Sequence, residues 1–205
     1  MTASVAGVLD RVHDRFVLDR RVRVIVGHLA ALVPAGADLL DVGSGDGAVA
    51  LSLMQQRPDV RARGIDVFVR GRTHIPVQPF DGVHIPAADR SVGTVMLVDV
   101  LHHTDDPAAL VAEAARVARD AVVIKDHLAD GLLAVPTLAF MDRVGNVRHG
   151  VRLPYNYLTR ARWDEAFARA GLRVDDWRGR LGLYPPPASW LFDRGLHFAT
   201  RLVPA

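Results

Sequence analysis

Cysteine is absent from the 205 residues of this sequence. Its absence excludes disulfide bonds, thiolate zinc sites, a cysteine nucleophile and thiol redox chemistry. The apolar core of a secretory signal is missing too, because Asp10, Arg11, Asp14 and Arg15 interrupt the segment where it would lie. We therefore expect a cytoplasmic protein.

A surplus of charge of one sign is also missing, since 25 Lys and Arg residues face 23 Asp and Glu residues and leave a formal net charge of +2. A nucleic-acid-binding protein carries a larger, clustered basic surplus. No stretch reaches the roughly 18 uncharged residues of a membrane-spanning helix. The sequence therefore predicts neither a nucleic-acid nor a membrane partner. Its apolar content of 50% is typical of one folded domain.

Lysine is almost absent: 24 of the 25 cationic residues are arginine, and Lys125 is the only lysine. Arginines occur throughout the chain, so we attribute this bias to composition. Lys125 follows the apolar run 121–124, which has the pattern of a short buried strand. Two interpretations stay open for it. It is either a solvated cation at a strand end or a placed group, whose ammonium contacts a substrate or pairs with Asp99 or Asp126.

Apolar periodicity predicts helices and strands in alternation. The helical segments are 5–18, 21–33, 48–56, 107–119, 132–143 and 159–170. The strand segments are 38–42, 60–67, 92–98, 121–125, 173–181 and 196–203. Between 68 and 81, Pro76 and Pro79 prevent a long helix, and we expect at most a short helical turn. The alternation predicts a mostly parallel sheet covered on both faces, with the last two strands pairing antiparallel at an edge.

A cluster of glycines follows the first strand, in the run LLDVGSGDG over 39–47. Glycine is needed where the backbone takes a positive φ or passes close to a ligand. With Ala48, the cluster also satisfies the dinucleotide fingerprint in its alanine form, and Asp66 follows at about the expected 20 residues. A nicotinamide-binding oxidoreductase is therefore one alternative.

Two acids near this loop favour a different ligand. Asp41 precedes the loop and Asp46 lies within it, whereas a pyrophosphate binds best to a helix N-terminus free of anions. Carboxylates suit a ligand that carries an ammonium and a sulfonium, as the amino-acid part of S-adenosylmethionine does. Asp46 fits equally well as a plain helix N-cap.

Several motifs in order resemble the class I S-adenosylmethionine-dependent methyltransferases. LLDVGSGDG resembles their glycine-rich first motif, GIDV over 64–67 the end of their second strand, and AVVIKDH over 121–127 their fifth strand and its turn. The stretch FDGVHIPAADRSVGTVMLVDVLHHTDDP, over 80–107, is similar to the part that carries the third and fourth strand ends. The first motif alone is not specific, but the ordered set is.

The resemblance implies S-adenosyl-L-methionine as cofactor and gives roles to particular residues. Asp66 would hold the ribose hydroxyls and Asp81 the adenine amine, although a stretch of 14 residues with two prolines replaces the family's fuller helix between them. His102 and His103 would lie beside the methionine end of the cofactor or the substrate. The implied cofactor contacts are Asp41, Gly43, Ser44, Gly45, Asp66, Val67, Asp81, Gly82, Asp99 and His102.

The resemblance also implies a Rossmann-like, doubly wound α/β fold. Its sheet would have seven strands, mostly parallel with an antiparallel edge strand, under an N-terminal helical cover. We expect a single domain over 1–205. Its parts would be N-terminal helices (1–36), a cofactor-binding core (37–127) and acceptor-side helices and edge strands (128–205).

Methyl transfer from a sulfonium is an in-line displacement that needs positioning rather than a protein nucleophile. An oxygen or nitrogen acceptor benefits from a general base. The candidate catalytic residues, all at predicted strand ends, are His103, His127 and Lys125. Asp126 with His127, or Asp105 with Asp106, would be the pairs to consider for a metal. Because neither spacing is diagnostic, we expect no metal site.

The acceptor should bind in the parts least similar to the family. The stretch 141–158 is rich in hydrogen-bond donors and arginines, which suits a small polar or acidic molecule. On a proline-rich loop, Trp190 and Phe192 offer either a pocket wall or a homodimer contact.

The predicted function is O- or N-methylation of a small-molecule acceptor. A nicotinamide-dependent oxidoreductase and a non-catalytic cofactor-binding protein are the alternatives. The oxidoreductase alternative is disfavoured because the sequence lacks the Tyr-x-x-x-Lys pair of many reductases. The only lysine is Lys125, and position 121 is not tyrosine. The alternative of a non-catalytic cofactor-binding protein is disfavoured because Asp41, Asp66 and the loop glycines are all present.

Overall fold

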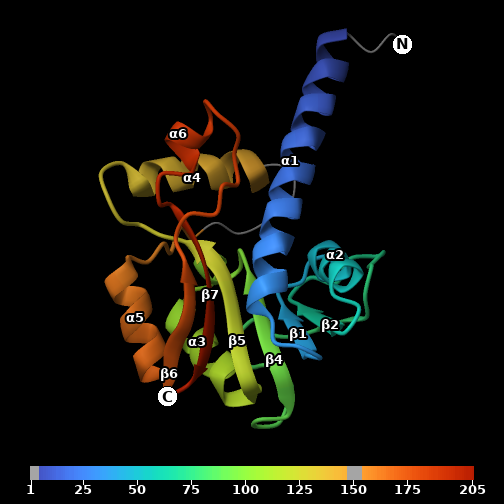
Figure 1. Cartoon of the computed structure of the whole chain (residues 1–205), viewed down its shortest axis with the longest axis vertical. Coiled ribbons are helices and arrows are strands. Elements are labelled where there is room, and N and C mark those ends of the chain that lie inside the picture. Colours follow the sequence, from blue (N-terminus) through green and yellow to red (C-terminus); the bar gives the residue numbers. More distant parts are fainter. Residues whose placement is uncertain (1–4, 147–153) are drawn as a thin grey trace.

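The computed structural model describes residues 5–146 and 154–205, which form a seven-stranded sheet in the order β3-β2-β1-β4-β5-β7-β6 (Figure 1). The strands are β1 (Asp38–Val42), β2 (Arg61–Asp66), β3 (Val77–Pro79), β4 (Val92–Val98), β5 (Ala118–His127), β6 (Leu172–Arg178) and β7 (His197–Pro204). Neighbours among β1 to β5 pair in parallel, and β7 runs antiparallel to both β5 and β6. The predicted fold class is confirmed, with β7 as the antiparallel strand beside the outermost β6.

Helices cover both faces of this sheet. They are α1 (Val5–Leu32), α2 (Ala48–Gln56), the 3₁₀ turn η1 (Leu101–His103), α3 (Pro107–Val117), α4 (Ala134–Asn146), α5 (Arg160–Arg169) and α6 (Ser189–Phe192). Successive strand residues face opposite sides: Leu40 and Val122 lie in the core formed with α3 and α5, whereas Leu39 and Val123 lie in the core formed with α1 and α2. Among the described residues, no helix has both the length and the apolarity needed to cross a bilayer.

One local prediction was wrong, and one short strand was not predicted. The helices expected over 5–18 and 21–33 are one continuous helix, α1, because the residues between them include no proline or glycine. The segment 68–81 holds no helix, and instead contributes the short strand β3, paired in parallel with β2. Pro79 is compatible with β3 because that strand lies at the edge of the sheet, where a missing N–H costs no ladder hydrogen bond.

The parallel strands β1 to β5 all end at the same edge of the sheet. In the strand order, β1 lies between β2 and β4, so the chain leaves it toward one side and returns on the other. Open α/β sheets bind ligands at such a switch point, outside the carboxyl ends of the strands. The predicted site residues after β1, β2, β3 and β4 are thereby brought to one edge.

Candidate functional site

The glycine loop after β1 is held against the end of β2. The N–H groups of Gly43 and Ser44 donate to the carbonyl oxygen of Ile65, at 2.8 and 3.2 Å. Asp46 Oδ1 accepts from the N–H of Ala48 at 3.1 Å. Asp46 therefore bonds the first residue of α2, but the N-cap is Gly47, without a side-chain cap, so the interpretation of Asp46 as the N-cap was wrong.

Gly43 combines a left-handed backbone with a close neighbour. Its φ is +73°, and a Cβ placed there would lie 2.5 Å from Cγ2 of Val100. We expect Gly43→Ala to lower the free energy of unfolding by about 2 kcal/mol or more, from backbone strain and overpacking together. Denaturant unfolding followed by circular dichroism measures this loss.

Gly36 provides the matched control for this variant. Its φ is +66°, but no atom lies within 4 Å of a Cβ placed on it. Gly36→Ala should therefore show only the cost of the left-handed backbone, about 1 kcal/mol. Equal losses in the two variants would mean that the contact with Val100 does not constrain the loop.

Asp66 ties the loops after β1 and β2 together. One carboxylate oxygen accepts from the N–H of Gly45 at 2.7 Å, and the other accepts from the N–H of Phe68 at 2.9 Å.

Asp41, near the end of β1, is buried, with only 3% of its surface exposed. Burial, and then the nearby carboxylate of Asp66, raise the pKa of Asp41 to about 8, so Asp41 is mostly protonated at neutral pH and contributes little negative charge to the loop.

Apolar side chains lie exposed beside Asp66. Val67, Phe68 and Val83 are 66%, 74% and 51% exposed, and a Cβ on Gly82 would lie 3.0 Å from Cγ1 of Val67. The loops after β2 and β3 therefore touch and offer an apolar surface next to a carboxylate. The adenosine part of S-adenosylmethionine needs both features, so these residues fit that group.

Asp81 is the exposed acid of this region. Its Oδ1 accepts from the N–H groups of Val83 and His84, at 2.7 and 2.6 Å. These hydrogen bonds lower the pKa of Asp81 to about 2. The other oxygen, Oδ2, lies 3.0 Å from Nδ1 of His84, so both oxygens of this charged group already have partners beside the apolar surface, where the resemblance places the adenine amine.

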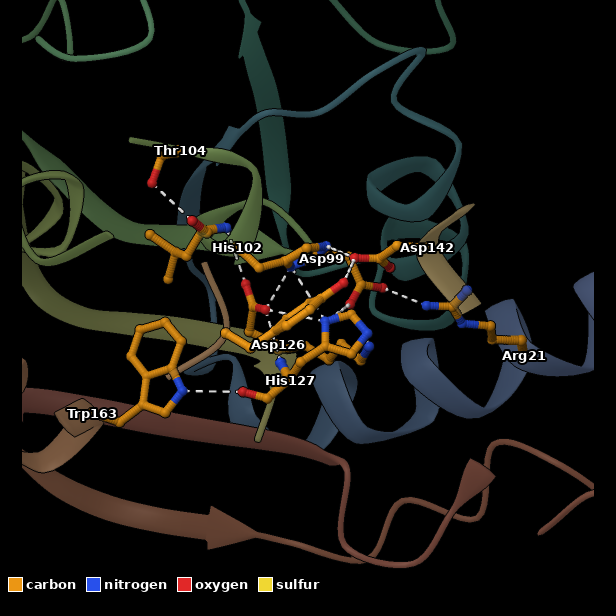
Figure 2. A network of polar contacts seen from close by, with 11 residues as sticks. Arg21, Asp99, His102, Thr104, Asp126, His127, Asp142 and Trp163 are labelled. Carbon is orange, nitrogen blue, oxygen red and sulfur yellow. Dashed lines mark hydrogen bonds and ion pairs between the residues drawn. The ribbon is translucent and has the colours of Figure 1, made fainter. Parts of the chain in front are cut away.

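A buried polar network follows the ends of β4 and β5 (Figure 2). Asp99 is bonded by Arg21 of α1, at 2.9 Å, and by the ammonium of Lys125. Lys125 is 1% exposed, so the interpretation as a solvated cation was wrong and the predicted pairing with Asp99 is confirmed. Burial alone would raise the pKa of Asp99, but Lys125 and Arg21 hold it well below its ordinary value.

The second part of this network joins His102 of η1 to Asp126 and His127 of β5. His102 Nδ1 lies 2.7 Å from Asp126 Oδ1, and His127 Nδ1 lies 3.2 Å from His102 Nδ1. Burial alone would lower the pKa of His102, but Asp126, Asp142 and Asp99 outweigh it and raise that pKa. Burial lowers the pKa of His127.

The predicted site residues thus fall into two groups. Gly43, Ser44, Gly45, Asp66, Val67, Asp81 and Gly82 lie along the loops after β1, β2 and β3, with Asp41 buried beneath them. Asp99 and His102, predicted as cofactor contacts, and Lys125 and His127, predicted as catalytic, have side chains engaged in the buried network.

His103 differs from these engaged side chains. It is only partly buried, and its Nδ1 has no hydrogen-bond partner among the described residues. Burial and then the neighbouring His102 lower its pKa. That nitrogen is itself buried, but among the candidate bases His103 has the least buried side chain, since Lys125 and His127 are 1% and 2% exposed.

Sequence analysis missed several members of the network. Arg21 was treated only as one of the arginines that occur throughout the chain, and His197 was not singled out because it lies in an ordinary strand pattern. Asp142 and Tyr157 belong to the predicted acceptor stretch 141–158, whose residues 147–153 lie outside the described part of the chain. The Tyr157 hydroxyl donates to Asp142, which lies 3.5 Å from Nε2 of His102.

A cavity of about 540 Å³ opens between the start of α3 and α5. Its lining includes Asp105, Tyr155, Asn156 and Arg162. The amide of Asn156 donates to the carbonyl oxygen of Thr104 at 2.7 Å, directly after η1. The cavity therefore carries groups of both signs, and its acidic side, at Asp105, begins two residues after His103.

Comparisons with known proteins bear on what this site does. Residues 12–176 match the family described as a methyltransferase domain. A search of curated proteins finds no match. Among solved structures, the chain bound to the Trm112 methyltransferase activator of Haloferax volcanii is 18% identical, with a TM-score of 0.68 and coverage of 94% of this chain and 93% of that one.

Two further structures are similar. An S-adenosylmethionine-dependent methyltransferase of Thermotoga maritima has a TM-score of 0.66 at 15% identity, covering 95% of this chain and 96% of that one. The cyclase SpnF has a TM-score of 0.63 at 15% identity, covering 88% and 80%. Identities this low show a shared fold, which carries more than one chemistry. The match over 12–176 spans most of the sequence, and the chain therefore belongs to the methyltransferase-domain family, whose methyl donor is S-adenosyl-L-methionine.

Proposed function

We propose that this protein transfers the methyl group of S-adenosylmethionine to an oxygen or nitrogen atom of a small polar molecule. The observation that carries the proposal is the junction of the glycine loop with the exposed apolar surface. Asp66 accepts hydrogen bonds from the N–H groups of Gly45 and Phe68. It therefore holds the glycine loop next to the apolar surface, and these two parts together would bind the methyl donor. When bound, S-adenosylmethionine supplies an electrophilic methyl group on a sulfonium.

The residues of the chain have distinct tasks in this proposal. Gly43 and Gly45, both left-handed, let the backbone approach the amino-acid part of the donor. Asp66 accepts from the ribose hydroxyls, while Val67 and Phe68 cover the adenine face. Asp81 accepts from the adenine amine. These groups bind and orient the donor, and near-attack positioning supplies much of the rate.

The acceptor side would lie beyond η1, which ends at His103 and is followed two residues later by Asp105, part of the lining of the cavity between α3 and α5. His103, which is less buried than His127 and Lys125, would take the proton of an acceptor hydroxyl or ammonium group. Arg162 and Asn156 in the cavity would bind polar groups of the acceptor. A polar molecule suits this cavity better than a hydrocarbon because its lining carries charges of both signs.

Asp66→Ala tests the donor site. We expect binding of S-adenosylhomocysteine, the demethylated product, to weaken by about 1–3 kcal/mol, or about 5- to 150-fold, because hydrogen bonds to a charged acceptor are lost. Isothermal titration calorimetry measures this affinity. Asp38→Ala is the control, since Asp38 begins β1 at the opposite end of the same strands, and its side chain pairs, within residues 5–146 and 154–205, only with Arg63 at the surface. Unchanged binding in Asp66→Ala would place the ribose elsewhere.

A further inference from the structure

Three potential metal ligands converge at the ends of β4 and β5. In Figure 2 the side chains of His102, Asp126 and His127 point toward one another. The separations are 2.7 Å between His102 Nδ1 and Asp126 Oδ1, 3.3 Å between His127 Nδ1 and the same oxygen, and 3.2 Å between the two ring nitrogens. All three residues are buried.

These separations are close to those of atoms that share one metal ion. With bonds of about 2.1 Å, neighbouring ligands lie about 3.0 Å apart at right angles and about 3.4 Å apart in a tetrahedron. Two of the separations, 3.2 and 3.3 Å, fall within that range, whereas the 2.7 Å between His102 Nδ1 and Asp126 Oδ1 is shorter and would have to lengthen by about 0.3 Å around an ion. We infer that His102, Asp126 and His127 form a binding site for a divalent transition-metal ion, a site that the sequence analysis did not expect.

Hydrogen bonding alone satisfies this cluster poorly. The two ring nitrogens of His102 and His127 face each other as well as the same carboxylate oxygen, Asp126 Oδ1. If both nitrogens carry a proton, two N–H groups oppose each other. If only one of the two nitrogens carries a proton, that single proton has to be shared among the three contacts that join the two nitrogens and the carboxylate oxygen. A cation placed among the three atoms engages all of their lone pairs together.

The surroundings resemble the second layer of a metal site. Histidine ligands commonly direct their other ring nitrogen at a carboxylate, which orients the ring, and His102 Nε2 lies 3.5 Å from Asp142 Oδ2. The other oxygen of Asp126 accepts from the N–H of Leu101 at 3.0 Å. The carbonyl of His127 accepts from the indole N–H of Trp163 at 3.0 Å. Each ligand is thus fixed by a further contact.

A fourth histidine, His197 of β7, provides an independent observation. It is 2% exposed, and neither of its ring nitrogens has a hydrogen-bond partner among the described residues. Its ring centroid lies 4.9 Å from that of His127. Buried polar atoms left without partners are costly. A water molecule bound to the metal beside His127 would provide such a partner.

The donor set indicates the class of ion. Two imidazoles and one carboxylate suit zinc or iron(II) better than magnesium or calcium, which prefer oxygen ligands. Three protein ligands leave coordination positions open, as in catalytic rather than structural sites.

Calorimetric titration of the full-length, chelator-treated protein with zinc chloride tests this site. The wild type should bind one zinc ion at one saturable site. His127→Gln should weaken that binding at least 100-fold. His28→Gln is the control, because His28 lies in α1 and contacts only the Leu181 carbonyl among the described residues; it should bind as the wild type does. Absence of a saturable site, or equal loss in both variants, would overturn the inference.

Anomalous diffraction from zinc-soaked wild-type crystals covers the case in which His127→Gln does not fold. The expected result is a zinc peak among His102, Asp126 and His127. A peak elsewhere, or none, would contradict the site. No methyl donor is present in either experiment, so failure of the metal site leaves the proposed methyl transfer intact, and loss of donor binding leaves the metal site intact.

Discussion

Asp99→Ala should lower the free energy of unfolding by about 3–5 kcal/mol, the usual cost of breaking a buried ion pair by removing one partner. The ammonium of Lys125, only 1% exposed, would remain in the interior without its carboxylate. Arg21 would lose the same partner, and with it the contact that holds α1 to the end of β4. Urea unfolding followed by circular dichroism measures the change.

An exposed pair is the control for this variant. The side chains of Arg119 and Asp120 are 53% and 51% exposed, so Asp120→Ala should cost at most about 1 kcal/mol. A double variant, Asp99→Leu with Lys125→Met, should recover only part of the loss, because it removes both members of this pair but leaves Arg21 without its carboxylate. An Asp99→Ala protein as stable as Asp120→Ala would show that Lys125 has another partner.

His103→Gln should slow methyl transfer by about 10²- to 10⁴-fold, the usual contribution of a general base. The side chain follows β4 on the acceptor side, and its Nδ1 has no partner among the described residues. Glutamine keeps polarity and approximate size but cannot take up the proton. Transfer of a labelled methyl group to an acceptor found by screening small phenols, hydroxy acids and amines measures the rate.

Donor binding separates a catalytic loss from a structural one. Affinity for S-adenosylhomocysteine should be unchanged in His103→Gln, because the proposed donor contacts lie after β1, β2 and β3. His28→Gln, remote from both sites, should retain the wild-type rate. A His103→Gln protein that transfers methyl groups at full speed would remove this residue from the reaction.

The sheet and its ligand-binding edge could be predicted from the sequence because their signals are local. The run 39–47 carries its strand, turn and glycines within nine residues, and Asp106 and Thr159 each start the helix predicted for them. Strand β3 carried no such signal. It has three residues and ends in proline, and pairing with β2 at the sheet edge defines it.

The buried network could not be predicted from local sequence patterns. Asp99 and Lys125 meet because β4 and β5 are neighbours in the sheet, with Val98 opposite Lys125. Arg21 reaches Asp99 from 78 residues away, across the packing of α1 on the sheet. The sequence identified Lys125 as unusual and named Asp99 as a partner, but its burial depended on neighbours that only the fold brings together. The same is true of His102 and His127, whose convergence no spacing revealed.

The central claim is that the glycine loop and the surface beside Asp66 bind S-adenosylmethionine. Calorimetric titration of the wild-type protein with S-adenosylmethionine, S-adenosylhomocysteine and NADH tests it most directly. The account predicts one-to-one binding of the first two ligands and no binding of NADH. Binding of NADH without either of the others would contradict it and favour a nicotinamide-dependent oxidoreductase.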